Sequence, residues 1–183
     1  MTPFHVIQAA LSPDECDRLI ATCAAAPARD AGLVGGAVAH QIRRADLIWL
    51  DDLPGQSWVM DRMVRLVAEA NRESFGFDLT EFAESAHVAR YGAERAGHFD
   101  WHSDIGAGVL AAKRKLTVVV QLSAAAGYAG GVLDLWPDSQ TRAVPRQQGL
   151  AVVFPSFVLH RVTPVTEGVR WSLTLWAHGP EFR

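Results

Sequence analysis

Histidine or aspartate occupies every second position of the segment 98–104. Alternate residues of a β-strand share one face, so a strand here would place an imidazole nitrogen beside a carboxylate oxygen. Two such pairs are present, His98 with Asp100 and His102 with Asp104. Either pair could occupy two neighbouring coordination positions of one metal ion, and a third ligand must come from elsewhere in the chain.

His160 is the candidate third ligand, and it follows an apolar strand and turn at 152–156. Two histidines and one carboxylate on one face of an octahedron suit non-haem Fe(II) oxygenases, which keep three positions for cosubstrate and O2. Zinc hydrolases accept the same three ligands, and Asp100 or Glu167 would then be the candidate general base. A metal-free β-barrel binding module is the third interpretation.

Arg170 favours the oxygenase interpretation. A hairpin through Glu167-Gly168 is expected to return the chain antiparallel and to bring Arg170 into the same cavity as His160. A buried arginine near a metal needs an anion, and the distal carboxylate of 2-oxoglutarate offers one that a guanidinium can bind through two parallel hydrogen bonds. Ser172 faces the same way as Arg170 and could add a hydroxyl hydrogen bond.

Other polar and aromatic residues have weaker claims to the site. Three residues could point into the barrel and touch 2-oxoglutarate: Tyr91, Gln121 and Lys115. Three others precede an apolar strand and suit either the substrate opening or a solvated loop: Gln41, Arg43 and Arg44. Isolated histidines in a β-rich core are usually structural, so that interpretation is given to His5, His40, His87 and His178. Packing roles are expected for Trp136, Trp171 and Trp176.

Short strands must position these side chains. Seven segments rich in β-branched and aromatic residues are bounded by turn residues, at 88–91, 97–102, 115–122, 131–136, 149–154, 159–165 and 169–178. The first third instead favours helices. One begins at Ser12, where Glu15 completes a capping box and Pro13 suits the first helical position, and another spans about 56–75, with a strand at 46–50 between them.

These elements predict an α+β chain with helical support at about 1–85 and an all-β barrel or jelly roll at about 86–178. A length of 183 residues with 49% hydrophobic residues suits a single domain, 1–183. Cys16 and Cys23 lie two helical turns apart, which is too far for a disulfide.

Charge and hydropathy exclude some partners. The net charge of −3 predicts no basic surface for nucleic acid or anionic membranes. Apolar stretches are far shorter than the roughly 20 residues that cross a bilayer, and the first residues lack a secretory signal pattern. We therefore expect a cytoplasmic protein that binds neither nucleic acid nor membrane. The sequence does not indicate its oligomeric state.

The ordered motifs resemble a known family. They are the HxD motif ending at Asp104, Gly130-Gly131, the Pro-Ser pair before His160, and the Gly-x-Arg-x-Ser pattern around Arg170. Together they resemble the prolyl 4-hydroxylase-like branch of the Fe(II)/2-oxoglutarate dioxygenases, over roughly 86–178. The resemblance implies a double-stranded β-helix with N-terminal helices packed against one sheet. It favours His102, with Asp104 and His160, as the iron ligands and Arg170 as the 2-oxoglutarate residue.

The resemblance also implies the reaction. Fe(II), 2-oxoglutarate and O2, with ascorbate as reductant, would hydroxylate an unactivated C–H of a protein side chain, amino acid or small metabolite, releasing succinate and CO2. Because Asp104 fills the position that a halide needs, hydroxylation is favoured over halogenation. The expected partner is therefore a small-molecule or peptide substrate.

Overall fold

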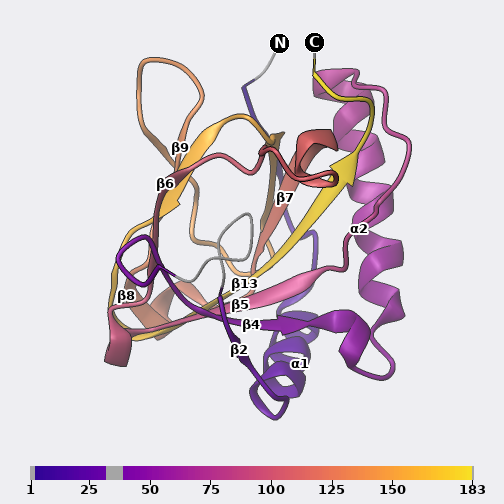
Figure 1. Cartoon of the computed structure of the whole chain (residues 1–183). Coiled ribbons are helices and arrows are strands. Elements are labelled where there is room, and N and C mark those ends of the chain that lie inside the picture. The colour runs from indigo at the N-terminus through magenta and orange to yellow at the C-terminus, as the bar shows by residue number, and fades with distance from the viewer. Residues whose placement is uncertain (1–2, 32–38, 183) are drawn as a thin grey trace.

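The computed structural model describes residues 3–31 and 39–182, which form two antiparallel β-sheets flanked by helices (Figure 1). The large sheet contains, in spatial order, β1 (His5–Ile7), β11 (Ala151–Pro155), β7 (Arg114–Gln121), β13 (Val165–His178), β5 (His87–Gly92), β4 (Asp46–Trp49) and β2 (Arg29–Asp30), and β8 (Tyr128–Gly130) pairs with β13. The small sheet contains β10 (Arg142–Ala143), β9 (Leu133–Trp136), β12 (Leu159–Val162), β6 (His98–His102) and β3 (Arg43–Arg44).

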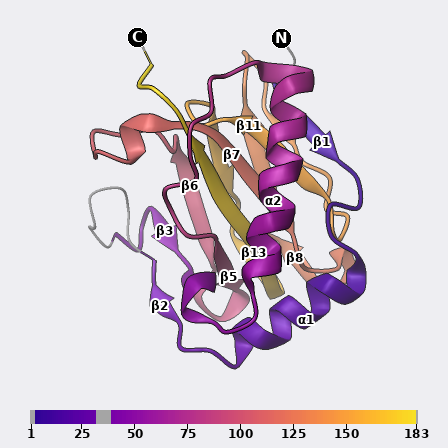
Figure 2. The same cartoon turned by 90° about the vertical axis from the view of Figure 1, so that its right-hand side faces the viewer.

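Both predicted helices are present. The first, α1 (Pro13–Ala24), begins with the expected capping box, in which the Ser12 hydroxyl accepts from the Glu15 amide and the Glu15 carboxylate accepts from the Ser12 amide. The second, α2 (Ser57–Ala70), continues into the π-helical turn η2 (Asn71–Phe75). The short 3-10 turns are η1 (Leu50–Asp52), η3 (Ala93–Arg95), η4 (Ala111–Lys113) and η5 (Ala125–Gly127). Figure 2 shows α1 and α2 across one face of the large sheet.

The core has two parts because the large sheet is covered on both faces. Met63 and Val67 of α2 are fully buried in the cluster that also contains Leu175 of β13. Leu135 and Phe154 belong to a second cluster, between the two sheets. Full burial of one such aliphatic or aromatic side chain contributes about 1.5–3 kcal/mol. The helices therefore stabilise the outer face of the sheet whose inner face carries the candidate site.

The predicted hairpin through Glu167-Gly168 is wrong. β13 begins at Val165 and continues through this dipeptide, where Gly168 pairs with Tyr128 of β8. Gly168 has a φ of +66° and approaches the Gly127 carbonyl too closely for a side chain, so a glycine is required there. The chain thus passes from the small sheet to the large one between β12 and β13. Arg170 consequently reaches the space between the sheets from the opposite wall.

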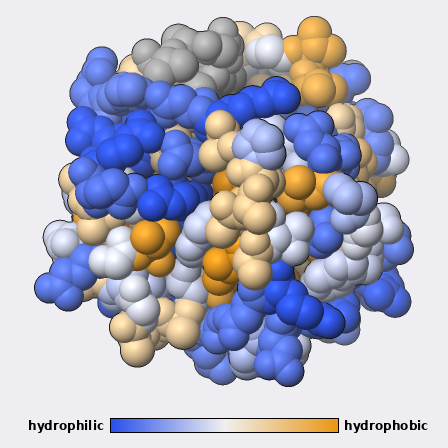
Figure 3. All heavy atoms as spheres, turned by 90° about the horizontal axis from the view of Figure 1, so that it is seen from below, coloured by the Kyte–Doolittle hydropathy of each residue, from blue (hydrophilic) through white to orange (hydrophobic). Residues whose placement is uncertain are grey.

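Both cysteines are buried and free, as the sequence predicts for Cys16 and Cys23. Burial raises the pKa of each thiol to about 11. Hydrophilic residues cover most of the face seen in Figure 3, with hydrophobic residues in small groups among them. Within residues 3–31 and 39–182, no helix combines the length and apolar character needed to cross a membrane.

Candidate active site

A β-bulge in β6 separates the two HxD pairs. His102 stands opposite His160 of β12, but Phe99 stands opposite Val162, so two residues of β6 face one of β12. Such a bulge interrupts the alternation of side chains between the two faces of a strand. Phe99 and His102 therefore both line the cavity between the sheets, whereas Asp100 is exposed. The expectation that all four alternate ligands share one face is wrong for this reason.

The first pair is occupied by contacts with the backbone. The ring nitrogens of His98 lie 3.0 Å from the Ala96 carbonyl oxygen and 3.2 Å from the Gln41 carbonyl oxygen. The Asp100 carboxylate accepts a 2.8 Å hydrogen bond from the Trp101 amide. In the described part of the chain, neither residue joins a group with metal-ligand spacing.

His102, Asp104 and His160 converge, and their ligand atoms all lie within 4.8 Å of one another. Nε2 of His102 is 3.6 Å from Oδ1 of Asp104, and Nε2 of His160 is 3.5 Å from Oδ2. His102 ends β6, Asp104 lies in the loop just after it, and His160 comes from β12. The Asp104 amide donates to the Ser156 carbonyl at 2.9 Å, which fixes the loop beside β12.

The hydrogen bonds of the two imidazoles suit them to hold a metal. Nδ1 of His102 lies 2.7 Å from the Asp100 carbonyl oxygen, and Nδ1 of His160 lies 3.0 Å from that of Val158. A carbonyl only accepts, so each Nδ1 carries the proton and each Nε2 presents its lone pair. Burial, reinforced by His160, lowers the pKa of His102 to about 3, which keeps the ring of His102 neutral.

The Asp104 carboxylate is held by two donors. Thr117 Oγ1 and Trp176 Nε1 both donate to Oδ2, at 2.7 and 3.0 Å. Burial alone would raise the pKa of Asp104, but the positive charge that His160 and His102 would carry if protonated, together with these hydrogen bonds, lowers it. The carboxylate is therefore ionised at neutral pH and oriented. Both properties fit an oxygen ligand for a divalent cation.

Arg114 supports this arrangement from behind. It donates to the Asp104 carbonyl at 2.9 Å, and its guanidinium lies 3.7 Å from the centre of the Trp176 ring. Two hydrogen bonds pair it with Glu84, which also lies 2.9 Å from Nε2 of His178. Burial opposes ionisation of Glu84, but Arg114 and His178 outweigh it and lower the pKa of Glu84 to about 2. The charge of Arg114 is thus already neutralised.

A cavity of about 240 Å³ between the sheets contains the convergent ligands. Asp104 is the only carboxylate among the described residues that line it. The two candidate bases of the hydrolase interpretation lie elsewhere, since Asp100 and Glu167 are both exposed and neither lines the cavity. Neither of the two general bases that the sequence offered for a zinc hydrolase therefore reaches the site.

Arg170 lies in the same cavity as His160 and is 2% exposed. Its Nε donates to Gln121 Oε1 at 3.2 Å and one terminal nitrogen donates to Ser172 Oγ at 3.3 Å. The ring of Tyr91 lies 5.5 Å from the guanidinium carbon. Burial lowers the pKa of Arg170, and no carboxylate in residues 3–31 or 39–182 forms an ion pair with it. A buried cation of this kind needs an anion.

Gln121 contacts the guanidinium but does not line the main cavity. Its Nε2 donates to the Tyr128 hydroxyl at 2.9 Å while its Oε1 accepts from Arg170. Tyr128 is therefore part of the support for Arg170, which the sequence did not indicate. Lys115 lies outside the cavity, with Nζ 3.5 Å from the centre of the Phe182 ring. The interpretation of Lys115 as a 2-oxoglutarate contact is not supported.

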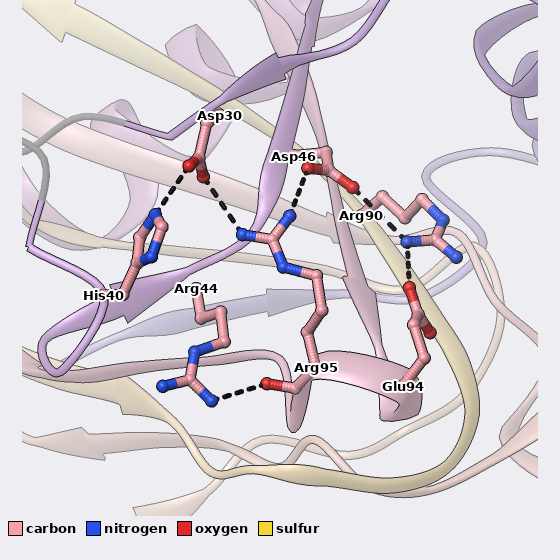
Figure 4. Close-up of polar contacts among 7 residues, drawn as sticks. All are labelled: Asp30, His40, Arg44, Asp46, Arg90, Glu94 and Arg95. Atoms are coloured by element: carbon pink, nitrogen blue, oxygen red, sulfur yellow. Dashed lines mark hydrogen bonds and ion pairs between the residues drawn. The ribbon is translucent and has the colours of Figure 1, made fainter.

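Arg43 lines the cavity from β3, with its guanidinium 4.4 Å from the Phe99 ring centre. A polar network beside it joins β2, β3, β4, β5 and η3 (Figure 4) through Asp30, His40, Arg44, Asp46, Arg90, Glu94 and Arg95. Arg95 pairs with both Asp30 and Asp46, and its carbonyl accepts a 2.8 Å hydrogen bond from Arg44. The network thus anchors the strand that carries Arg43.

Two of the cavity residues had been given other roles from the sequence. Trp176 was expected to be a packing residue, and His87 a structural one, yet both line the cavity. Trp176 stands six positions after Arg170 in β13, so strand alternation places the two on one face. This spacing was the available signal. Ser172 lies between them on the same face and also lines the cavity, as expected, together with Tyr91.

Comparison with known sequences identifies relatives. Residues 86–178 match a family model described as the 2OG-Fe(II) oxygenase superfamily. A PKHD-type hydroxylase of Delftia acidovorans is 28% identical over 173 residues, which cover 94% of this chain and 76% of that protein. A PKHD-type hydroxylase of Hyphomonas neptunium is 36% identical over 72 residues, 39% of this chain and 32% of that protein.

Solved structures share the fold. A Pseudomonas putida prolyl-4-hydroxylase superposes with a TM-score of 0.78 and 26% identity, covering 97% of this chain and 93% of that one. A Trichoplax adhaerens prolyl hydroxylase, solved with a hypoxia inducible factor peptide fragment, gives a TM-score of 0.82 at 17% identity over 97% of this chain and 84% of that one. The predicted jelly-roll fold is confirmed.

Proposed function

The chain belongs to the 2OG-Fe(II) oxygenase superfamily, and we propose that it is a hydroxylase in which His102, Asp104 and His160 hold Fe(II) while Arg170 holds 2-oxoglutarate. One observation carries this proposal. Two imidazole Nε2 atoms and a carboxylate converge within 4.8 Å in a cavity that also contains a buried arginine. Membership of the superfamily implies Fe(II), 2-oxoglutarate and O2 as cofactor and cosubstrates.

Each residue has a defined task in this proposal. With 2-oxoglutarate and O2, bound Fe(II) supplies an oxidation in which one oxygen atom becomes a substrate hydroxyl and the other enters succinate as CO2 leaves. Arg170 binds the distal carboxylate of 2-oxoglutarate, and Ser172 and Tyr91 border that carboxylate site. Thr117 and Trp176 orient Asp104 through their hydrogen bonds. The protein thereby positions the reactants and keeps water from the site.

For the substrate, we propose a peptide or protein side chain, with proline as the first residue to test. Support comes from the 26% identical Pseudomonas putida prolyl-4-hydroxylase and the PKHD-type hydroxylase relatives. The cavity walls also suit an apolar ring, because Trp49, Phe99 and Trp176 all line the cavity. Aromatic walls of this kind favour burial of aliphatic ring carbons.

The test is succinate formation from 2-oxoglutarate by the full chain loaded with Fe(II), with proline-containing peptides and free L-proline compared as substrates. We expect peptide-stimulated succinate release and a peptide product heavier by one oxygen atom. The Asp104→Ala variant and the Zn(II)-loaded protein should form neither. A protein that forms no succinate under any of these conditions, but hydrolyses a peptide or ester with Zn(II), would establish the hydrolase alternative instead.

A further inference from the structure

His87 lies in the wall of the cavity, at the start of β5. It pairs across the sheet with Trp49 of β4 on one side and with Thr174 of β13 on the other. Both neighbours line the same cavity. The ring of His87 is held between two indoles, with its centre 4.9 Å from that of Trp49 and 5.2 Å from that of Trp176. Its position is therefore fixed by packing.

This imidazole has no hydrogen-bond partner among the described residues. His87 is 2% exposed, and its Nδ1 is completely buried with no partner. Its Nε2 forms no hydrogen bond to a described residue either. Unlike Nδ1, however, Nε2 is not completely enclosed. A buried polar group left without a partner is energetically costly, so native proteins rarely keep one.

The other buried histidines show the contrast. Nδ1 of His178 accepts from the Ala83 amide and its Nε2 contacts Glu84. His102 and His160 each use Nδ1 on a backbone carbonyl and point Nε2 at Asp104. His87 does not belong to the metal-ligand group of His102, Asp104 and His160. It is therefore neither a satisfied core histidine nor a ligand.

The environment of His87 keeps it uncharged. Burial, with the nearby Arg43 guanidinium, lowers the pKa of His87 to about 3. A neutral imidazole has one donor and one acceptor nitrogen. If the proton sits on Nε2, the enclosed Nδ1 keeps only an unused lone pair, which is less costly than an enclosed N–H without an acceptor. The ring then offers one uncharged donor to the cavity.

We propose that His87 binds the substrate directly, with Nε2–H donating a hydrogen bond to an uncharged amide carbonyl of a peptide. An uncharged amide suits a neutral donor between two indoles, whereas a substrate carboxylate would be drawn to a guanidinium such as that of Arg43, which also lines the cavity. Arg114 is already paired with Glu84, and Arg170 has its own anion to bind under the proposed function, on which this inference rests. His87 is thus a specificity residue for amide-containing substrates.

The experiment uses the full chain loaded with Zn(II) and 2-oxoglutarate, so that binding is measured without turnover. The probe is N-acetyl-L-prolinamide, and L-proline is the charged comparison. Imidazole nitrogen NMR, with His87 assigned from the His87→Phe variant, should show a neutral Nε2–H ring whose signals move on titration with the amide probe but not with L-proline. Signals that stay in place at saturating probe, or a probe that does not bind, would overturn the proposal in favour of a bound water.

Variants give a second readout. His87→Phe keeps the ring shape and should weaken binding of the amide probe about 5- to 10-fold, the worth of one neutral hydrogen bond, with 2-oxoglutarate affinity unchanged. His87→Gln retains a neutral donor and should recover most of the affinity. His5→Phe, on β1 outside the cavity, is the matched control. Equal binding by His87→Phe and the unmodified chain contradicts the proposal, whereas the succinate assay tests the proposed function separately.

Discussion

The indole Nε1 of Trp176 donates a 3.0 Å hydrogen bond to Oδ2 of Asp104, 72 positions earlier in the chain. Trp176 comes from β13 of the large sheet, while Asp104 follows β6 of the small sheet. The bond therefore crosses the cavity wall between the two sheets. It ties the carboxylate to the same strand that carries Arg170, so the two halves of the candidate site share one rigid support.

Loss of this hydrogen bond should lower the affinity of the site for the metal. Trp176→Phe keeps an aromatic ring but removes the donor, and residues that orient a ligand typically contribute about 10- to 100-fold in metal affinity. Calorimetric titration of the metal-free protein with Fe(II) under anaerobic conditions measures the change. Trp101→Phe is the control, because Trp101 packs near Trp136, with ring centres 5.9 Å apart, outside the cavity. Equal affinities for the two variants would contradict the assigned role.

Arg170→Gln should weaken 2-oxoglutarate binding at least about 30-fold, because a buried, hydrogen-bonded charge pair loses roughly 2–5 kcal/mol when one partner is removed. The dissociation constant for 2-oxoglutarate in the Zn(II)-loaded protein reports this directly. Arg161→Gln is the matched control, since Arg161 pairs with Asp134 at 2.9 Å and lies outside the cavity. If Arg170→Gln bound 2-oxoglutarate normally, the cosubstrate would have to be held elsewhere.

The lowered pKa of Glu84 leads us to expect a loss of folding stability in acid. Its pKa is about 2 in the folded protein and about 4.5 unfolded, so the unfolded chain binds more protons between those pH values. Stability should be fully present above pH 4.5 and fall as the pH drops toward 2, by about 3 kcal/mol from this group.

The Glu84→Gln variant tests this linkage. It should be less stable than the unmodified chain at pH 7, and the difference should shrink below pH 4.5. Urea unfolding at several pH values provides the measurement, and the exposed Glu69→Gln variant is the control. A difference that stays constant with pH would show that Glu84 does not act through its charge.

Local signals in the sequence predicted much of the fold. The capping box at Ser12 marks the start of α1, and the apolar stripe through Met63 and Val67 marks α2. Both depend on residues within one or two turns of each other. The strands were predicted for the same reason, since alternation and turn residues are local properties.

Long-range pairing limited what could be predicted of the site. The bulge that turns Phe99 and His102 to one side exists only because β6 pairs with β12, and no local pattern encodes it. The course of β13 through Gly168 depends on β8 in the same way. His87 looked like any isolated histidine, because its missing hydrogen bonds depend on Trp49 and Trp176, which are distant in sequence.

His102, Asp104 and His160 are proposed to hold the iron, and the iron content of anaerobically reconstituted variants tests this assignment most directly. The unmodified chain and His98→Ala should each retain one Fe(II) per chain, because His98 only bonds backbone carbonyls. His102→Ala and His160→Ala should retain almost none. Loss of iron from His98→Ala with full retention by His102→Ala would contradict the account and assign the metal to the other HxD pair.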